Sequence, residues 1–228
     1  MLTGIITSRL ASTRLPRKAL LDLCGKPMLH QIVDRVRKSN VDEVIVATTT
    51  KDDEIADYCH KNDIKVYQGS EEDILDRLYC ASIGYDHILR VWGDSPMVDP
   101  EIINKVIDYY YSNLASGYLY SIWYPAGQNV AMCDFKTLEN AHRIVENPYD
   151  RLWIHKWFTQ QKDTKIFADS YEDLSHLNYT VDTLEDLERM REWYGTHLTT
   201  SMGRSFQVLN GSILSADIKS DSTTKDMS

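Results

Sequence analysis

Short apolar runs alternate with amphipathic segments through the first hundred residues, and this alternation restricts the possible folds more than any other feature. Apolar runs of four to eight residues are typical of buried strands, and apolar residues at helical spacing indicate helices. Strands alternating with helices predict an α/β protein whose mostly parallel sheet has helices on both faces. The expected strands are Leu2–Thr7, Glu43–Thr49, Lys65–Gln68 and His87–Trp92, and the expected helices are Pro27–Arg37, Asp53–Lys61, Glu71–Ile83 and Pro100–Tyr111.

The pattern changes after Gly117. The apolar runs 118–124 and 129–133 surround the turn-forming Pro125-Ala126-Gly127 and predict a small hairpin appendage at about 118–133. Further on we expect helices over 135–145, 151–161 and 184–194, and short strands near 164–168 and 178–181. One domain over residues 1–215 is expected. The tail 216–228 is rich in Ser, Thr, Asp and Lys, which predicts disorder.

Composition excludes several functional classes. The net charge of −9 argues against binding to nucleic acid or to an anionic membrane surface. We find no apolar run near the ~20 residues that span a bilayer and no secretory leader. The 4 cysteines form no Cys-x-x-Cys pair, which favours reduced thiols in the cytoplasm. The 7 histidines lack metalloprotease spacing, so a zinc site is not expected.

A cationic loop follows the first predicted strand. It carries Arg9, Arg14, Arg17 and Lys18 together with the hydroxyl of Ser12. Arginine forks bind phosphate oxygens in pairs, and lysine adds a point charge, so this loop suits a polyphosphate. The alternative is a solvated charged surface without a ligand.

Polar residues also follow other predicted strands, and ligands of open parallel sheets bind beyond the carboxyl ends of the strands. Asp94 comes after His87–Trp92, and Asp182 comes after the short apolar run 178–181. Two carboxylates suit Mg²⁺, which shares the phosphates of its substrate. The alternatives are a turn at Asp94 and a helix cap at Asp182. Neither a Gly-x-Gly-x-x-Gly nor a Gly-Lys-Ser/Thr motif occurs, which disfavours dehydrogenases and ordinary P-loop proteins.

Several ordered blocks resemble the cytidylyltransferases, which include the CMP-3-deoxy-manno-octulosonate and CMP-sialic acid synthetases. The spore-coat polysaccharide biosynthesis branch is the most similar. The resemblance covers roughly residues 4–195. Its blocks are S-T-R-L-P-x-K (Ser12–Lys18), G-K-P-M (Gly25–Met28), V-A-T-T-T (Val46–Thr50), G-S-E-x-D-x-L-D-R (Gly69–Arg77), R-V-x-G-D-x-P-x-x-D-P (Arg90–Pro100) and D-L-S-H-L-x-x-T-V-D-T-x-E-D-L (Asp173–Leu187).

The resemblance implies a Rossmann-like fold of the nucleotide-diphospho-sugar transferase type, with Mg²⁺ as cofactor and CTP as nucleotide. The implied reaction activates a sugar acid or a sugar 1-phosphate and releases pyrophosphate. It places the triphosphate on Arg9, Ser12, Arg14 and Lys18, the metal on Asp94 and Asp182, and the base or ribose near Gly69, Ser70 and Asp73. Arg14, Lys18 and Asp94 are the expected catalytic residues. Alternatives are a GTP-using enzyme of the same branch and a non-catalytic nucleotide-binding module.

The acceptor is the least determined partner. Relatives usually carry Gly at Arg17 and a smaller residue at Trp92, and acidic residues are expected where Asn129 and Ala131 stand. Trp92 either lines the nucleotide pocket or belongs to the core. We expect Asn129, Arg151 and His155 to bind the acceptor, although Arg151, His155 and Lys156 also read as a polar helix face.

Relatives also imply a homodimer formed through the segment 118–133. Its aromatic residues suit an interface. The alternative is that they pack in the core of their own chain. They are Tyr118, Tyr120, Trp123 and Tyr124.

Overall fold

The computed structural model describes residues 1–114, 116–169 and 172–198 of the 228. The domain end expected at 215 and the tail 216–228 lie outside the described residues. The strands are β1 Leu2–Thr7, β2 Asp22–Leu23, β3 Lys26–Pro27, β4 Glu43–Thr49, β5 Lys65–Gly69, β6 His87–Trp92, β7 Tyr118–Ser121, β8 Ala131–Asp134 and β9 Lys165–Phe167. The helices are the 3₁₀ turn η1 Lys18–Leu20 and α1 Met28–Val36, α2 Asp53–Lys61, α3 Ile74–Ala81, α4 Pro100–Asn113, α5 Phe135–Ile144, α6 Pro148–Leu152, α7 Ile154–Thr159 and α8 Leu184–Leu198.

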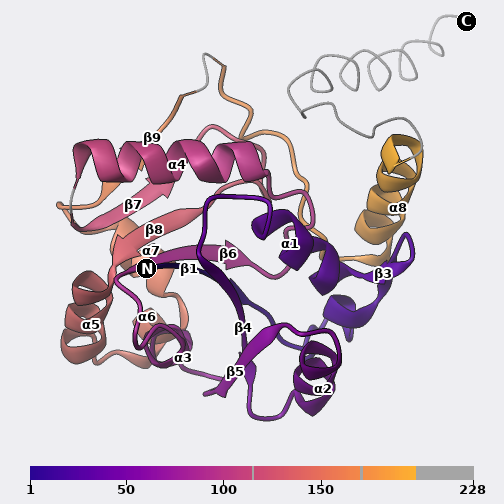
Figure 1. Ribbon diagram of the computed structural model, residues 1–228, viewed down its shortest axis with the longest axis horizontal. Helices are drawn as coiled ribbons and strands as arrows, with labels where there is room; N and C mark the ends of the chain where they lie inside the picture. Colours follow the sequence, from indigo (N-terminus) through magenta and orange to yellow (C-terminus); the bar gives the residue numbers. More distant parts are fainter. Residues whose placement is uncertain (115, 170–171, 199–228) are drawn as a thin grey trace, which may run out of the picture.

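A seven-stranded sheet in the order β5-β4-β1-β6-β8-β7-β9 forms the centre of the fold (Figure 1). β5, β4, β1 and β6 are parallel, β8 runs antiparallel to both β6 and β7, and β9 is parallel to β7. The mostly parallel α/β fold is therefore confirmed. The hairpin expected over 118–133 is present as β7 and β8, but these strands lie within the main sheet between β6 and β9, so they do not form an appendage.

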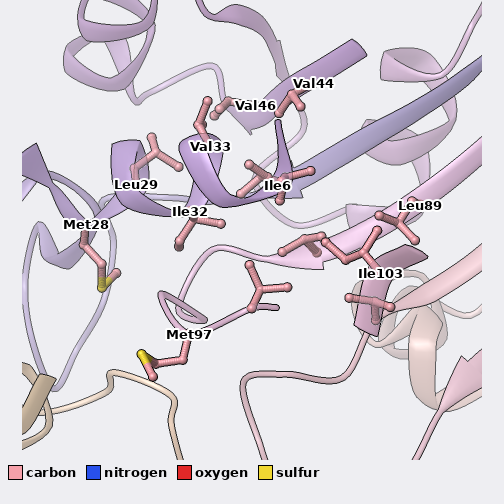
Figure 2. Packing of buried hydrophobic residues seen from close by; sticks show 14 of the residues in the cluster. Ile6, Met28, Leu29, Ile32, Val33, Val44, Val46, Leu89, Met97 and Ile103 are labelled. Carbon is pink, nitrogen blue, oxygen red and sulfur yellow. The ribbon is translucent and has the colours of Figure 1, made fainter. Parts of the chain in front are cut away.

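Two apolar clusters, one on each side of the sheet, form the core. One joins residues of α1, α2, α4 and α8 to side chains such as Ile6, Val46 and Leu89, and Figure 2 shows part of its packing. The other joins residues of α3, α5 and α7 to Ile5 and Ile88. Neighbouring residues of one strand, such as Ile5 and Ile6, enter opposite clusters because strand side chains alternate between faces.

Two helices and one strand differ from the expected ranges, and local backbone geometry accounts for the helices. Asp73 caps α3 by accepting from the amide of Asp76 at 2.8 Å, so this helix begins at Ile74 rather than at Glu71. The helix expected over 151–161 is divided at Trp153, whose backbone leaves the helical region with ψ 42°. The strand expected over 178–181 is an extended loop that forms a single bridge to Ala126.

Most aromatic residues of the segment 118–133 pack within the chain. Tyr118 stacks on Phe158 with ring centroids 4.1 Å apart, and the buried Tyr124 donates to Asp169. Trp123 is exposed. In the part of the chain that the structure describes, no helix has the length and apolar character needed to cross a membrane.

The carboxyl ends of β1 and β6 lie side by side at the point where the chain order of the sheet reverses. Thr7 pairs with Trp92 in the register of these strands, and the amide of Gly93 donates to the Thr7 carbonyl at 2.9 Å. A Cβ atom at Gly93 would lie 2.5 Å from that carbonyl oxygen and 2.8 Å from the Ser8 Cβ. Glycine is thus required at position 93, where the chain segments that follow β1 and β6 leave the sheet close together.

Candidate active site

A cavity of about 450 Å³ opens beyond the carboxyl ends of β1 and β6, where ligands of open parallel sheets bind. The loop after β1, the end of β6, helices α3, α6 and α7, and Asp182 form its walls. Residues far apart in the sequence therefore meet in one cleft. The lining contains Arg9, Ser12, Arg14, Lys18, Asp94, His155 and Asp182, all predicted from the sequence, and Arg77, Arg90, Trp92, Trp153 and Lys156.

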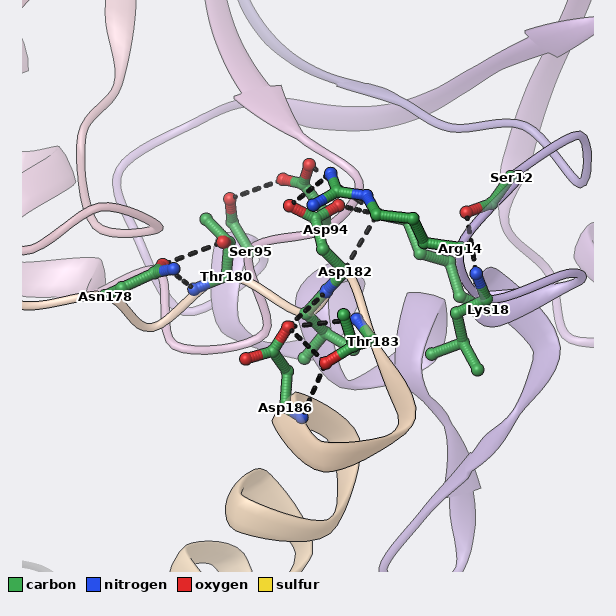
Figure 3. A network of polar contacts seen from close by, with 12 residues as sticks. Ser12, Arg14, Lys18, Asp94, Ser95, Asn178, Thr180, Asp182, Thr183 and Asp186 are labelled. Carbon is green, nitrogen blue, oxygen red and sulfur yellow. Dashed lines mark hydrogen bonds and ion pairs between the residues drawn. The ribbon is translucent and has the colours of Figure 1, made fainter.

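Four charged residues gather at one end of the cavity, and we call Arg14, Lys18, Asp94 and Asp182 the charged cluster (Figure 3). The Lys18 ammonium donates to an Asp182 oxygen at 2.9 Å and lies 3.8 Å from an Asp94 oxygen. The Arg14 guanidinium pairs with the other Asp182 oxygen at 3.0 Å. Arg14 is 65% exposed and Lys18 only 13%, so Lys18 is the more firmly held cation.

Backbone hydrogen bonds place Asp182 beside Asp94. The Val181 amide donates to the Asp94 carbonyl at 2.8 Å, and the Val181 carbonyl accepts from the Lys18 ammonium at 2.8 Å. After Asp182 the chain enters α8 through a capping box, in which the Asp186 carboxylate accepts from the Thr183 amide and the Thr183 hydroxyl accepts from the Asp186 amide. Asp182 is thus fixed on both sides.

The cationic loop is attached to the sheet through Asp52. One oxygen of this buried carboxylate accepts from the Leu10 amide at 3.1 Å, and the other accepts from both hydroxyls and one amide of Thr48 and Thr49. The threonines of the V-A-T-T-T block therefore orient Asp52. Sequence reasoning missed this positioning residue, although a carboxylate directly before a predicted helix was its signal.

Arg17 lies on the outer side of the loop. Its side chain is 57% exposed and pairs with Glu54, and it is not among the residues that line the cavity. Its backbone is left-handed, with φ 60° and ψ 21°. Because glycine adopts this conformation without steric cost, the geometry accounts for the glycine that resembling sequences usually carry here.

Trp92 and His155 form the other end of the cavity, and Tyr120 packs against both rings from outside the lining. We call Trp92, Tyr120 and His155 the aromatic wall. The His155 ring lies edge-on to Trp92, with centroids 5.1 Å apart, and 4.2 Å from Tyr120. Its Nδ1 atom shares a hydrogen bond with the Tyr118 hydroxyl at 2.9 Å. Burial, reinforced by the nearby positive charge of Arg90, lowers the pKa of His155 to about 4. This histidine is therefore neutral at pH 7.

Two buried arginines also line the cavity. Arg77 is 2% exposed and donates to the Ser70 carbonyl. Arg90 is 8% exposed, and its guanidinium carbon lies 4.8 Å from the centre of the Trp92 ring. Burial, followed by the charges of Arg90 and Arg9, lowers the pKa of Arg77 to about 10. Sequence reasoning gave neither arginine a role. The available signal for Arg90 was strand alternation, which places side chains two residues apart, such as Arg90 and Trp92, on one face.

Other residues predicted for the site lie outside the cavity lining. Asp73 caps α3 and also binds Arg151 Nε at 2.6 Å, so these two predicted ligand-binding residues pair with each other. Gly69 packs against Arg77, since an added Cβ would lie 3.2 Å from its Cγ. Ser70 Oγ accepts from the Asp73 amide. Asn129 is half-buried, and its Oδ1 atom has no hydrogen-bond partner among the described residues.

The donor set of the charged cluster fits a magnesium ion. Asp94 and Asp182 already flank one cationic group, the Lys18 ammonium. Mg²⁺ commonly takes one or two carboxylates and completes its shell with phosphate and water oxygens. Within the described residues no larger group of His, Cys, Asp and Glu side chains is arranged for a metal. The arrangement therefore suits a metal that arrives with a polyphosphate.

Comparisons with known proteins agree with this geometry. The cytidylyltransferase family model matches residues 3–199. The spore coat polysaccharide biosynthesis protein SpsF of Bacillus subtilis is 31% identical over 204 residues, which cover 83% of this chain and 85% of the relative. A cytidylyltransferase structure from Leptospira borgpetersenii serovar Hardjo-bovis has a TM-score of 0.86 at 25% identity, covering 99% of both chains.

A further solved structure shares the fold at lower identity. It is a CMP:2-keto-3-deoxy-manno-octonic acid synthetase in complex with CTP, with a TM-score of 0.71 and 19% identity, and the match covers 86% of this chain and 99% of that one. The expected nucleotidyltransferase fold is thereby confirmed. The family model spans nearly all described residues, and SpsF matches along most of its own length. The chain therefore belongs to the cytidylyltransferase family and is an enzyme of that type.

Proposed function

We propose that this enzyme transfers the cytidylyl group of CTP to a sugar acid or a sugar 1-phosphate, with Mg²⁺ as cofactor, and releases pyrophosphate. The convergence of the charged cluster in one cavity supports this proposal most directly. Two cations from the loop after β1 contact two carboxylates from distant segments. The names of the matched proteins, a spore coat polysaccharide biosynthesis protein and a synthetase bound to CTP, support the substrate class.

The charged residues divide the work of phosphoryl transfer. Arg9, Ser12, Arg14 and Lys18 would bind the triphosphate, and Asp94 and Asp182 would hold the metal. Bound there, Mg²⁺ would polarise the α-phosphate and stabilise the charge that develops on it. Lys18 and Arg14 now neutralise Asp182, so they would exchange this carboxylate for the β- and γ-phosphates. Their charge would then stabilise the leaving pyrophosphate.

The acceptor oxygen attacks the α-phosphorus in line. A new oxygen–phosphorus bond forms, the bond from the α-phosphorus to the bridging oxygen breaks, and its electron pair leaves with pyrophosphate. Positioning supplies much of the acceleration in such transfers. A sugar 1-phosphate already carries an anionic nucleophile, whereas a free hydroxyl must lose a proton. His155 is neutral at pH 7 because its pKa is about 4, so it would orient the acceptor as a hydrogen-bonding group.

The nucleotide itself is assigned by resemblance. We propose that the Gly69–Arg77 block, with Gly69, Ser70 and Asp73, faces the base or ribose. Asp73 would have to act while paired with Arg151. GTP in place of CTP is the second candidate. A pure binding module is the third, but it has less need of two carboxylates beside the cations.

A matrix assay tests the proposal. The four nucleoside triphosphates are each combined with Mg²⁺ and a panel of sugar acids, sugar 1-phosphates and neutral sugars, and pyrophosphate release is measured. We expect release with CTP and at least one acceptor, and none when EDTA removes the metal. Stabilisation by CTP without any product would identify a binding module, and a preference for GTP would replace the nucleotide assignment.

The partners and compartment remain predictions. The four cysteines are free thiols, which fits the reducing cytoplasm that we propose. We also propose a homodimer, and sedimentation equilibrium checks its mass. A monomer at micromolar concentration would contradict this assignment.

A further inference from the structure

We propose that the buried Arg90 binds an oxyanion of the acceptor, a carboxylate or a phosphate, at the end of the cavity that the aromatic wall encloses. The inference rests on the proposed function, and it assigns Arg90 as the residue that selects acidic over neutral acceptors. In a sugar acid the bound carboxylate would be distinct from the attacking hydroxyl, whereas in a sugar 1-phosphate the bound phosphate would also carry the attacking oxygen.

The first support is an unneutralised buried charge. Arg90 is 8% exposed, no carboxylate of the described residues lies within ion-pair distance of it, and its buried Nε has no hydrogen-bond partner there. A buried charge is destabilising unless it is paired, and an arginine stays charged at neutral pH. An anionic ligand would supply the missing partner.

The second support is the position of Arg90 in the sheet. The cationic loop leaves β1, and the block assigned to the nucleoside follows β5 on one side of it. Arg90 and Trp92 lie on β6, and their aromatic neighbours lie on β7 and α7, on the opposite side. Asp94 follows two residues after Trp92. The reacting phosphate would therefore lie between the nucleoside and Arg90, where an acceptor must bind.

The third support is the chemistry of the surroundings. Trp92 and Tyr120 are neutral, and His155 carries no charge at pH 7 because burial and Arg90 hold its pKa at about 4. Aromatic faces suit the apolar faces of a sugar ring. The Arg90 guanidinium lies over the Trp92 ring beside this neutral wall, so it would be the group that selects an acceptor by its charge. Arg77 is also buried with an unpartnered Nε, but it donates to the Ser70 carbonyl and lies in the block assigned to the nucleoside. Lys156 lines the cavity and is exposed.

A structural role for Arg90 is the competing explanation, because its charge also interacts with Asp94 and its plane covers Trp92. The two explanations differ in which kinetic constant changes. A counterion of Asp94 would affect the metal and therefore turnover with every acceptor. An acceptor-binding arginine would change the KM for the acidic acceptor and leave the KM for CTP unchanged.

The test compares Arg90→Met, Arg90→Lys and the remote control Arg143→Gln, which removes an exposed guanidinium from α5. The acceptor is the acid or sugar 1-phosphate that the matrix assay selects, paired with the neutral form of the same sugar. Arg90→Met should raise the acceptor KM at least 30-fold, with the KM for CTP within twofold, and abolish the preference over the neutral sugar. Arg90→Lys should recover part of the loss. An unchanged acceptor KM, or an equal rise in both KM values, would overturn the inference.

A second measurement needs no variant and no turnover. The His155 ring of the full chain is titrated by NMR with gluconate, glucose 1-phosphate and neutral glucose as probes. An oxyanion on Arg90 would offset the charge that lowers the pKa of His155, so the pKa should rise with the acid, the phosphate or both, but not with glucose. No shift with either anion would overturn the inference. A shift without pyrophosphate release in the matrix assay would support the anion site while rejecting the proposed function.

Discussion

The two ends of the cavity manage charge in opposite ways. In the charged cluster every cation contacts a carboxylate, with Lys18 and Arg14 both bound to Asp182. Beside the aromatic wall the buried Arg90 lies over the neutral Trp92 ring and pairs with no described carboxylate. The first end is self-neutralised and must exchange ion pairs to bind a ligand. The second end is preorganised around a charge that a ligand would neutralise.

This difference indicates how each end gains affinity. Exchanging one ion pair for another gives only a modest net binding free energy, because the loss of the first pair offsets the gain from the second. The charged cluster therefore suits a ligand that brings both a metal for the carboxylates and phosphates for the cations. The aromatic wall requires no broken ion pair. Its contribution depends on the burial of Arg90 and on the fixed ring of His155.

The largest effect is expected on turnover, when the charged cluster loses the carboxylate of Asp94. Asp94→Asn should reduce turnover about 10³-fold, equal to about 4 kcal/mol of transition-state stabilisation, since the amide is a poor metal ligand. Pyrophosphate release measures the loss, and thermal unfolding should show an intact fold. The control Asp34→Asn, whose side chain pairs with Lys26 outside the cavity lining, should retain activity. More than a tenth of wild-type turnover in Asp94→Asn would reject the metal assignment.

A substitution at Gly93, where β1 and β6 end side by side, should disrupt both ends of the cavity. The Cβ atom of Gly93→Ala would lie 2.5 Å from the Thr7 carbonyl oxygen, so the strand ends must separate. We expect about 3 kcal/mol of destabilisation, measured by urea unfolding, together with weaker binding of nucleotide and acceptor. Gly195→Ala in α8 is the matched control. Nothing lies within 4 Å of its added Cβ, and alanine should stabilise the helix slightly. Similar stability of both variants would contradict the packing argument.

The sequence predicted the charged end of the cavity better than the aromatic end. β1, β4 and β6 have the expected bounds, because continuous apolar runs define buried strands locally. Asp94 lines the cavity for the same reason, since it follows the predictable end of β6, and Lys18 belongs to the loop that leaves β1. Asp182 also lines the cavity, although it follows a loop with a single bridge and not the expected strand. The aromatic wall joins β6, β7 and α7, and its assembly depends on the break at Trp153 and on sheet order. The Asp73–Arg151 pair likewise depends on tertiary packing between α3 and α6.

Lowering the pH should reduce the stability of the fold through His155, which belongs to the aromatic wall and not to the charged cluster. Its folded pKa of about 4 lies below the ordinary 6.5, so the unfolded chain takes up a proton on this ring first as the pH falls. The stability linked to the neutral ring is complete above pH 6.5 and is lost as the pH falls from 6.5 through 4. This loss should reach about 2 kcal/mol, less than the full shift implies because the ring is partly open to the cavity.

His155→Gln removes this proton uptake. Its unfolding free energy should therefore decline less than that of the wild type between pH 6.5 and 4, in parallel urea titrations. The charged cluster should be unaffected, so the KM for CTP at pH 7.5 should stay within twofold. Stability curves that remain parallel over this pH range would show that the ring is accessible to protons in the folded chain.

The smallest effect is expected beside the charged cluster, at Arg17, where the backbone is left-handed. Arg17→Gly should stabilise the fold by about 0.5 kcal/mol, because relief of left-handed strain of about 1 kcal/mol is partly offset by the added freedom of the unfolded chain. The lost contact with Glu54 is a surface ion pair worth little, and Glu54→Gln alone measures it. Both KM values should remain unchanged, because Arg17 is not among the residues that line the cavity. A raised KM for CTP would instead place Arg17 among the triphosphate ligands and extend the charged cluster to the outer side of the loop.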